Sequence, residues 1–429
     1  MAALEVVLVG CGLRGRGVYG GFALRHPDRM RVVALAEPDP VRRQRTGDEH
    51  GVAEELRFSH WSELFDRPRL APAAIVATPD HEHVDPALRA LGAGYHVLLE
   101  KPIAPDPDGC LRVVEAAERN GRILQVGHVL RFAPFYERVF EMVRGGELGE
   151  IVHLELAERV AAWHFAHSFV RGKFRNRRTA APFVVAKCCH DLDLLVWLAG
   201  RTPERVASFG GLGHFASASA PPGSPERCTD GCPAQPGCPH DAVEFYLGVG
   251  DELGGIWPWS DLSPDPGRDA RRRALERGPY GRCVYRCDND QPDHQVVAVE
   301  FAGGLTGSFS VQGLAAEEER TLRITGSRGE LRGRLTSGSL ELRRAGSLAV
   351  HREEHPGSPI GHFGGDEGLC HHFCDSVSRG AGAGDRASGR VALEGHLLGY
   401  AAERARDRGG VVELAAFREE LPGGDPVRR

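Results

Sequence analysis

The sequence predicts an α/β protein of two domains, the first built on a doubly wound parallel sheet and the second on a mixed, largely antiparallel sheet. The chain has 429 residues, more than one ordinary core accommodates. Strands alternate with helices up to residue 126, and strands joined by glycine-containing turns follow one another after residue 296. We expect a first domain over residues 1–126, a second over 127–420 with an irregular cysteine-rich insertion at about 210–290, and a disordered tail over 421–429.

Short apolar runs define the parallel sheet of the first domain. Each run ends at a turn, as buried parallel strands do. Helical segments separate the runs, and Asp106 followed by Pro107 is a typical helix start. This alternation predicts right-handed crossovers and parallel strands. The predicted strands are 4–9, 31–36, 73–77, 96–99 and 123–126, and the helices include 83–93 and 107–120.

The second domain has a different pattern. Alternation of apolar and polar residues predicts antiparallel strands. The stretch from about 210 to 290 is rich in Gly, Pro and Cys, and it is too long for a bare loop, so it needs tie points of its own. The predicted helices are 135–144, 190–198 and 366–378, and the predicted strands are 151–160, 296–301, 305–311, 320–325 and 340–344.

Composition bounds the possible partners. The chain is 41% hydrophobic and 26% charged, with a net charge of -6 and a pI of about 6.4. These values give no electrostatic reason to expect nucleic acid or a membrane as a partner. Residues 1–9 resemble a first strand more than a signal peptide, so we expect a cytoplasmic protein. In such a reducing compartment the 11 cysteines are expected to be thiols or metal ligands.

A glycine motif predicts a dinucleotide site. Gly10-x-Gly12-x-x-Gly15 follows the first strand and opens a helix, where backbone N–H groups can bind a pyrophosphate. Glu37 ends the second strand, 22 residues beyond Gly15, where a carboxylate can hold ribose hydroxyls. This carboxylate favours NAD over NADP.

NADP stays an alternative, because Arg42 and Arg43 follow soon after and could accept a 2′-phosphate. Two further turns fall at carboxyl ends of predicted strands, where such sheets bind ligands. They are Thr78-Pro79 and Glu100-Lys101-Pro102. The predicted cofactor-binding residues are Gly10, Gly12, Leu13, Arg14, Gly15, Glu37, Thr78, Pro79, His83, Glu100 and Lys101.

The order and spacing of these motifs resemble the Gfo/Idh/MocA oxidoreductases from residue 4 to about 400. The motifs are the glycine segment, Glu37, Glu100-Lys101-Pro102 and His190-Asp191-Leu192-Asp193. The resemblance implies an N-terminal Rossmann domain, a C-terminal α/β domain with an open-faced sheet, and NAD(P) between them. It also implies a homodimer or homotetramer that pairs through the outer face of that sheet.

The resemblance further implies that Lys101 contacts the reacting hydroxyl and that His190 acts as acid and base. Typical members carry an aspartate four residues before this histidine, where the present chain has Ala186. Lys187 comes next, one of only three lysines with Lys101 and Lys173, which marks it as a candidate. If one helix carried Lys187 and His190, each cation would lower the pKa of the other. We therefore predict Lys101, His190 and Lys187 as catalytic residues.

These residues predict an oxidoreductase that moves a hydride between nicotinamide and a hydroxyl of a sugar, inositol or related polyol. An alternative is a glycoside-cleaving enzyme that uses NAD for transient oxidation followed by elimination. A non-catalytic NAD-binding regulator is a third reading, disfavoured by Lys101 and His190. Polar and aromatic side chains suited to a polyol are predicted as substrate contacts: His128, Arg131, Trp163, His167, Arg171, Asp193 and His294.

Five cysteines lie within the irregular insertion. Cys228, Cys232 and Cys238 have the spacing C-x3-C-x5-C, His240 follows, and Cys283 and Cys287 lie downstream. Four sulfur or nitrogen ligands around zinc could anchor a segment with little core of its own. The spacing matches no standard zinc finger, so free thiols remain the alternative. The predicted zinc ligands are Cys228, Cys232, Cys238 and Cys287.

Overall fold

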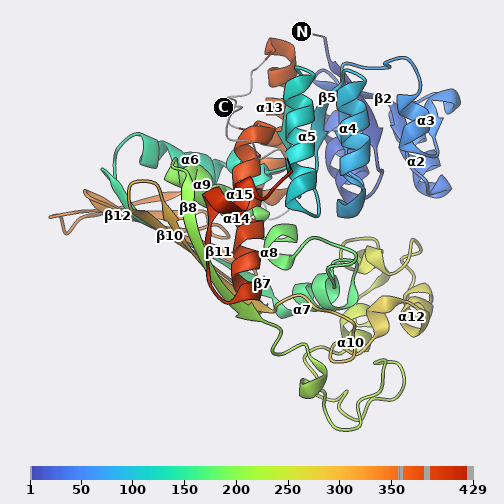
Figure 1. Ribbon diagram of the computed structural model, residues 1–429. Helices are drawn as coiled ribbons and strands as arrows, with labels where there is room; N and C mark the ends of the chain where they lie inside the picture. The colour runs from blue at the N-terminus through green and yellow to red at the C-terminus, as the bar shows by residue number, and fades with distance from the viewer. Residues whose placement is uncertain (1, 356, 358–360, 381–386, 423–429) are drawn as a thin grey trace.

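The computed structural model describes residues 2–355, 357, 361–380 and 387–422 (Figure 1). Its first sheet has six parallel strands in the order β3-β2-β1-β4-β5-β6, a doubly wound arrangement that confirms the prediction. The central strands are buried because helices cover both faces. The strands are β1 (Leu4–Val9), β2 (Met30–Ala36), β3 (Arg57–Phe58), β4 (Ala73–Val76), β5 (His96–Leu99) and β6 (Leu124–Val126).

The helices of the first domain begin where the sequence signals predict. Asp106 caps α5, its carboxylate accepting a 2.7 Å hydrogen bond from the backbone N–H of Gly109, and Pro107 is the first residue. The segment after the glycine motif begins with π-helical geometry. The elements are η1 (Leu13–Gly20), α1 (Gly21–Arg25), α2 (Pro40–His50), η2 (Glu54–Leu56), α3 (Trp61–Phe65), η3 (Asp80–Glu82), α4 (Val84–Gly92) and α5 (Pro107–Arg119).

The second sheet has nine strands in the order β14-β13-β12-β11-β7-β10-β9-β8-β15. Only the β7–β10 pair is parallel among the described strands of this sheet, so the predicted antiparallel character is confirmed. The strands are β7 (Ile151–Ala161), β8 (Pro203–Gly211), β9 (His294–Phe301), β10 (Leu305–Ala315), β11 (Glu319–Gly326), β12 (Gly329–Arg334), β13 (Ser339–Arg344), β14 (Val350–Glu354) and β15 (Val411–Glu413).

One face of this sheet is covered by helices and the other is open. On the covered face, α9 packs on β7 and β10 and α14 packs on β8. On the open face, Phe209 and Val296, which pair across β8 and β9, are 68% and 49% exposed. The helical elements are η4 (Val129–Phe132), α6 (Pro134–Arg144), α7 (Ala162–Phe165), η5 (Ala166–Arg171), α8 (Phe183–Ala186), α9 (Cys189–Ala199), η9 (His362–Gly364), α13 (Gly365–Arg379), α14 (Gly389–Arg408) and α15 (Leu414–Glu419).

The long helix α14 was absent from the prediction and joins the two parts of the molecule. Figure 1 shows it near the centre, and it packs against α5 of the first domain as well as β8 and α9 of the second. The preceding helix α13 also reaches the first sheet, because Gln125 on β6 donates a 2.9 Å hydrogen bond to the carbonyl of Leu369. The C-terminal helices therefore cover an edge of the N-terminal sheet.

The cysteine-rich insertion leaves the second sheet after β8 and returns at β9. It contains short helices, which corrects the expectation of a purely irregular segment, and Figure 1 shows α10 and α12 as a side lobe. The elements are η6 (Ser217–Ser219), α10 (Ala242–Leu247), α11 (Asp251–Gly254), η7 (Trp259–Asp261), α12 (Arg268–Arg277) and η8 (Pro279–Gly281).

Most of the predicted disordered tail, residues 423–429, lies outside the described residues. Among the helices of the described residues, none combines the length and apolar character needed to cross a membrane.

Candidate active site

The glycine motif makes a close turn at the carboxyl end of β1. Gly10 has φ of +87°, and a Cβ there would lie 2.6 Å from the carbonyl oxygen of Ala77. A Cβ on Gly15 would lie 1.8 Å from the carbonyl oxygen of Gly10, so helix and strand can approach only without side chains. A Cβ on Gly12 would meet nothing within 4 Å. The loop is therefore closed towards the protein and open where a phosphate would approach.

Glu37 lies directly beside this loop. Its carboxylate accepts a 2.6 Å hydrogen bond from the backbone N–H of Cys11 and a 3.1 Å bond from that of Asp39. Leu13, the first residue of η1, is 63% exposed, so the helix start is accessible. A dinucleotide fits this arrangement. Its pyrophosphate would lie on the loop, over Gly12 and at the free helix start, and its ribose would lie beside the carboxylate of Glu37 at the end of β2.

Arg14 is bound by protein groups from both domains. Its Nε lies 2.5 Å from Oε1 of Glu100, and its Nη1 lies 2.9 Å from Oδ1 of Asp366 on α13. Tyr19 donates a 2.6 Å hydrogen bond to the same oxygen of Glu100. Burial raises the pKa of Glu100, but the charge of Arg14 and the bond from Tyr19 outweigh burial and lower it. Arg14 and Glu100 thus connect the glycine loop to the C-terminal helices.

His83 connects the two predicted turns. Its ring nitrogens lie 2.8 Å from the carbonyl oxygen of Thr78 and 2.6 Å from that of Pro102, and the ring is buried. The Thr78-Pro79 turn is thereby held against the Lys101-Pro102 turn, whose peptide bond is cis. His83 therefore positions these turns through its own ring.

Lys101 reaches from the first domain to the second. Its Nζ donates a 2.8 Å hydrogen bond to the carbonyl oxygen of Ala186, the last residue of α8. An ammonium group has three donors, so two remain for other acceptors. The backbone at position 186, where the resemblance implies an aspartate, thus accepts a bond from the lysine.

His190 lies in the first turn of α9 and is 6% exposed. Its Nδ1 is buried and has no hydrogen-bond partner in the described structure. Burial lowers the pKa of His190 well below 6.5, and the charges of Lys101 and His128 lower it further. The ring centroids of His128 and His362 each lie 5.9 Å from that of His190. A neutral imidazole with a free nitrogen beside Lys101 is suited to accept a proton.

Lys187 does not share a helix with His190, which corrects that expectation. Lys187 follows Ala186, the last residue of α8, and a new helix, α9, starts at Cys189. Its Nζ lies 3.1 Å from Oε1 of Glu158 on the covered face of β7. Burial raises the pKa of the neighbouring Asp191, and the charge of Arg320 opposes this rise. Lys187 therefore joins a buried charge cluster with Glu158, Asp191 and Arg320.

Three predicted substrate residues form a second buried cluster next to His190. Arg131 binds Asp193 through two hydrogen bonds of 2.6 Å, and Nδ1 of His128 lies 2.7 Å from Oδ1 of Asp193. Burial raises the pKa of Asp193, but the charges of Arg131 and His128 outweigh it and lower the pKa to about 2. Arg131 and Asp193 are each 1% exposed, so they support the site from inside the protein.

Three other predicted substrate residues contact the insertion. The ring of Trp163 stacks on that of Phe245, with 5.7 Å between the ring centroids. Nδ1 of His167 lies 2.7 Å from the hydroxyl oxygen of Tyr246. Arg171 donates hydrogen bonds to the carbonyls of Arg282 and His240. These contacts place Trp163, His167 and Arg171 where the insertion docks, and their role as substrate contacts stays a prediction.

His294 lies on the wrong face of the second sheet for the predicted substrate role. It is exposed at the start of β9 with its Nδ1 2.7 Å from Asp293. Its side chain shares the open face with Val296, two residues on, whereas α9 and His190 lie on the covered face. The structure thus separates His294 from His190.

The predicted zinc set is not assembled. All 11 cysteines are free thiols. No three sulfurs among the described cysteines lie within 4.8 Å of one another, whereas zinc with about 2.3 Å bonds brings its sulfurs to about 3.8 Å. Cys287 donates its thiol to the carbonyl of Cys283 and does not line the cavity that the other predicted ligands share. The spacing in sequence did not reveal which downstream cysteine faces that cavity.

Several residues that support the site were missed or underused at the sequence level. Glu158 could have been found from the sequence, because it is a carboxylate at an inward-facing position of a strand in which buried and exposed residues alternate. His396 on α14 had none, yet its ring stacks on His128 at 5.1 Å and its Nε2 accepts a hydrogen bond from Ile103. Tyr19 and Arg320 likewise acquire their partners only through long-range packing.

With this geometry in view, comparisons with known proteins identify the family. Residues 4–128 match the model of an oxidoreductase family with an NAD-binding Rossmann fold, GFO_IDH_MocA. Residues 140–367 match the C-terminal alpha/beta domain of the same family. The two matches span most of the chain, which therefore belongs to the Gfo/Idh/MocA oxidoreductase family.

Curated relatives are distant. A putative oxidoreductase, YteT, of Bacillus subtilis is 26% identical over 271 residues, covering 60% of this chain and 59% of that protein. Inositol 2-dehydrogenase of Ralstonia nicotianae is 27% identical, covering 46% and 55%. The 2,7-anhydro-N-acetylneuraminate hydratase of Mediterraneibacter gnavus is 26% identical, covering 47% and 52%. The chain spans about half the length of such relatives.

Solved structures share the fold along the whole chain. An oxidoreductase from Agrobacterium radiobacter, crystallised with NAD+, L-tartaric acid and magnesium, superposes with a TM-score of 0.69 at 17% identity, covering 97% of this chain and 99% of that one. The apo scyllo-inositol dehydrogenase of Lactobacillus casei gives 0.64 at 16% identity, covering 96% and 99%. At this identity the likeness establishes the fold.

Proposed function

We propose that this protein is an NAD(P)-dependent oxidoreductase that transfers a hydride between nicotinamide and a hydroxyl of a sugar, inositol or related polyol. The observation that carries the proposal is the pairing of a lysine and a histidine from different domains. Lys101 extends from the carboxyl edge of the Rossmann sheet to the end of α8, four residues before His190, whose Nδ1 is free. The family membership supports the same activity.

The residues divide the chemistry between them. When bound, NAD(P) supplies the hydride acceptor or donor. In alcohol oxidation, Nδ1 of His190 takes the hydroxyl proton, because its lowered pKa keeps the imidazole neutral near pH 7. The two free donors of Lys101 hydrogen-bond the substrate oxygen and stabilise the negative charge that develops on it. Lys187 acts as a positioning residue, since its ammonium binds Glu158 beneath α9.

We propose NAD as the preferred cofactor. Glu37 is held at the glycine loop by the N–H groups of Cys11 and Asp39, so its charge lies where a 2′-phosphate of NADP would sit. Arg43 does not compensate, because its guanidinium is bound to the carbonyls of Glu37 and Pro38. The relative described as inositol 2-dehydrogenase supports a cyclic polyol as substrate.

The glycoside-cleaving alternative has one observation in its favour. The usual carboxylate at position 186 is absent, and the backbone there binds Lys101 instead. A chain that oxidises a substrate transiently would retain its cofactor and return the hydride in every cycle. NAD that copurifies with the protein and stays without net NADH during turnover would favour this alternative.

The direct test is a screen of sugars, inositols and sugar acids with NAD and with NADP, followed by the absorbance of the reduced cofactor. We expect a polyol to reduce NAD in wild type and not in Lys101→Ala. Failure of all polyols to change the cofactor or to be cleaved would contradict the proposal.

We also propose that two or more copies associate through the open face of the second sheet. Exposed apolar side chains gather on its central and edge strands, and an apolar patch of this kind is typical of a protein interface. The exposed members are Phe209, Val296, Leu314 and Val411.

A further inference from the structure

Four cysteines of the insertion converge from segments that are far apart in sequence. An isolated bridge pairs Arg227 with Arg282. The N–H of Cys228 bonds to the carbonyl of Gly281 and the N–H of Cys283 to that of Glu226, both at 2.9 Å. These bonds hold Cys228 and Cys283 side by side.

Together with Cys232 and Cys238, these two cysteines line one small cavity. The backbone thus gathers four thiols around a common space.

The spacing of the thiols is informative. No three of the four sulfurs, all in described residues, lie within 4.8 Å of one another, so the set is too open to wrap a single tetrahedral ion. All four cysteines nevertheless line the same cavity. Four cysteine thiolates on the wall of a small cavity match a group with several metal ions, in which each thiolate binds its own metal. Iron–sulfur clusters are held in this way.

Two further observations point to a ligand in the cavity. Arg171 is 2% exposed, and its Nη2 lies 3.8 Å from the sulfur of Cys228. His240 also lines the cavity and is 7% exposed, yet its Nδ1 has no hydrogen-bond partner in the described structure. The guanidinium beside the cysteines suits the negative charge of a thiolate-bound group, and the unsatisfied nitrogen of His240 is costly for a protein unless something fills the space.

The insertion has a small apolar core of its own, so a bound group would help to stabilise it. Its own apolar cluster contains only Ala242, Tyr246, Leu247 and Leu275 as buried members, around the short helices α10 and α12. A cluster bound by four cysteines would join the segment before α10 to the segment after η8. Because the four cysteines come together only in the folded lobe, the free energy of binding the cluster contributes directly to folding of the lobe.

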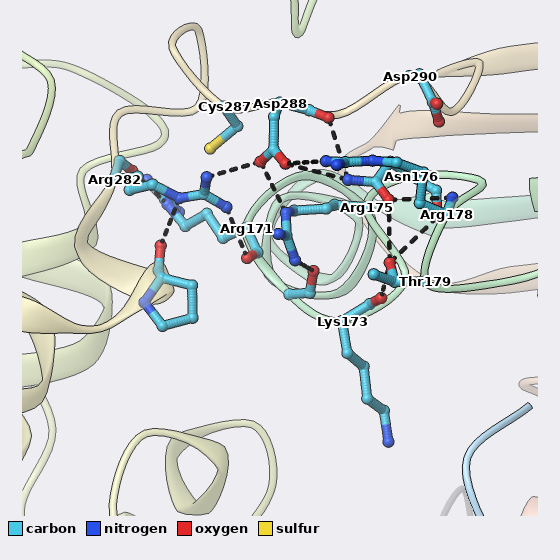
Figure 2. Close-up of polar contacts among 12 residues, drawn as sticks. Arg171, Lys173, Arg175, Asn176, Arg178, Thr179, Arg282, Cys287, Asp288 and Asp290 are labelled. Carbon is cyan, nitrogen blue, oxygen red and sulfur yellow. Dashed lines mark hydrogen bonds and ion pairs between the residues drawn. The ribbon is translucent and has the colours of Figure 1, made fainter. Parts of the chain in front are cut away.

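Cys287 is excluded from this set by its surroundings. Figure 2 shows it beside Asp288, which binds Arg175 at 2.7 Å and Arg282 at 2.7 Å. The thiol of Cys287 is directed to the carbonyl of Cys283 at 3.3 Å. Cys287 thus lies next to a separate polar network that fastens the end of the insertion to the segment after η5.

We propose that Cys228, Cys232, Cys238 and Cys283 bind an iron–sulfur cluster that holds the insertion together. The binding set differs from the sequence prediction in one cysteine, Cys283 in place of Cys287, and in the metal group. The cluster is a structural tie in this proposal, independent of the hydride transfer proposed above.

The full chain, purified without oxygen and reconstituted with ferrous iron and sulfide, tests the proposal. We expect iron and acid-labile sulfide in equal amounts, with visible absorbance that bleaches on reduction. Cys283→Ser should lose this signal, and the matched control Cys287→Ser should keep it. Zinc with no iron, iron without sulfide, or loss of the signal in Cys287→Ser alone would overturn the proposal.

A second measurement guards against misfolding of Cys283→Ser. Alkylation of the wild-type protein, read by mass spectrometry, should spare the four ligand cysteines when the cluster is present and modify them after chelation. Equal modification before and after chelation would overturn the proposal. NAD binding by Cys283→Ser reports whether its Rossmann domain is intact, so failure of the cluster and failure of the proposed oxidoreductase activity remain distinguishable.

Discussion

The ammonium of Lys101 donates a 2.8 Å hydrogen bond to the carbonyl of Ala186, and this bond joins the Rossmann sheet to the segment that carries His190. The lysine comes from the end of β5 and the carbonyl from the end of α8, 85 residues apart in sequence. The bond uses one of three ammonium donors and fixes the direction of the other two. The proposed reactive pair, Lys101 and His190, is therefore assembled from both domains.

Replacing Lys101 tests its role in the reaction. Lys101→Ala should lower kcat by about 10²–10⁴-fold, because the developing charge on the substrate oxygen loses its donor. NAD binding should change little, since the pyrophosphate and ribose sites lie on the glycine loop and Glu37. Steady-state kinetics and calorimetric NAD titration check both outcomes. Lys173→Ala, at an exposed lysine, is the matched control and should leave turnover intact; normal turnover in Lys101→Ala would contradict the mechanism.

The pH dependence of kcat/KM should report His190. Burial and the charge of Lys101 lower its pKa well below 6.5, so the base form persists as the pH falls. The acidic limb of polyol oxidation should therefore have its midpoint below pH 6.5. In His190→Gln the limb should disappear and kcat should fall by about 10²–10⁴-fold. His294→Gln, at an exposed histidine on the open face of the sheet, should keep the wild-type profile. A midpoint above 6.5 would contradict the assignment.

Cofactor preference should depend on Glu37. In Glu37→Ala the ratio of kcat/KM for NAD to kcat/KM for NADP should fall by about tenfold or more. The reason is that the repulsion between two like charges near a protein surface exceeds about 1 kcal/mol. Glu55→Ala removes the same charge at an exposed position of the same domain and should leave the ratio unchanged. An unchanged ratio in Glu37→Ala would remove Glu37 from cofactor recognition.

The Arg131–Asp193 pair should carry much of the local stability. Asp193→Asn leaves the charge of Arg131 buried without its carboxylate, which typically costs about 3–5 kcal/mol. Denaturant unfolding measures this loss. Glu300→Gln breaks the exposed ion pair with Arg205 and should leave the free energy of unfolding nearly unchanged. If both substitutions lowered the free energy of unfolding equally, this would contradict the stabilising role assigned to the buried Arg131–Asp193 pair.

Phe209 should report association of copies. The side chain is 68% exposed on the open face, so Phe209→Asp should fold normally but weaken an interface formed there. Light scattering of wild type should give an oligomer mass and that of Phe209→Asp a lower mass. Leu348→Asp, at a fully exposed leucine outside the strands, should associate as wild type does. A monomeric wild type would refute the proposed interface.

Much of the fold could be predicted because its determinants are local. The run of β1, the glycine motif and the cap at Asp106 each depend on neighbours within a few residues, and the structure reproduces them. Helix α14 escaped prediction because its sequence is rich in Ala and Gly with apolar residues on several sides, as suits a helix buried between two domains. Helix α14 is recognised from the elements that pack against it and not from a hydrophobic periodicity in its sequence.

The sequence by itself determined the doubly wound sheet, the dinucleotide loop with Glu37, and the candidacy of Lys101 and His190, since spacing and turn chemistry encode them. Only the tertiary structure decided which side chains meet. Arg14 pairs with Asp366 across 352 residues, and Cys283, not Cys287, faces the cavity of the insertion. The physical reason is that side-chain partners depend on how strands and helices pack over long range, and local periodicity carries no record of that packing.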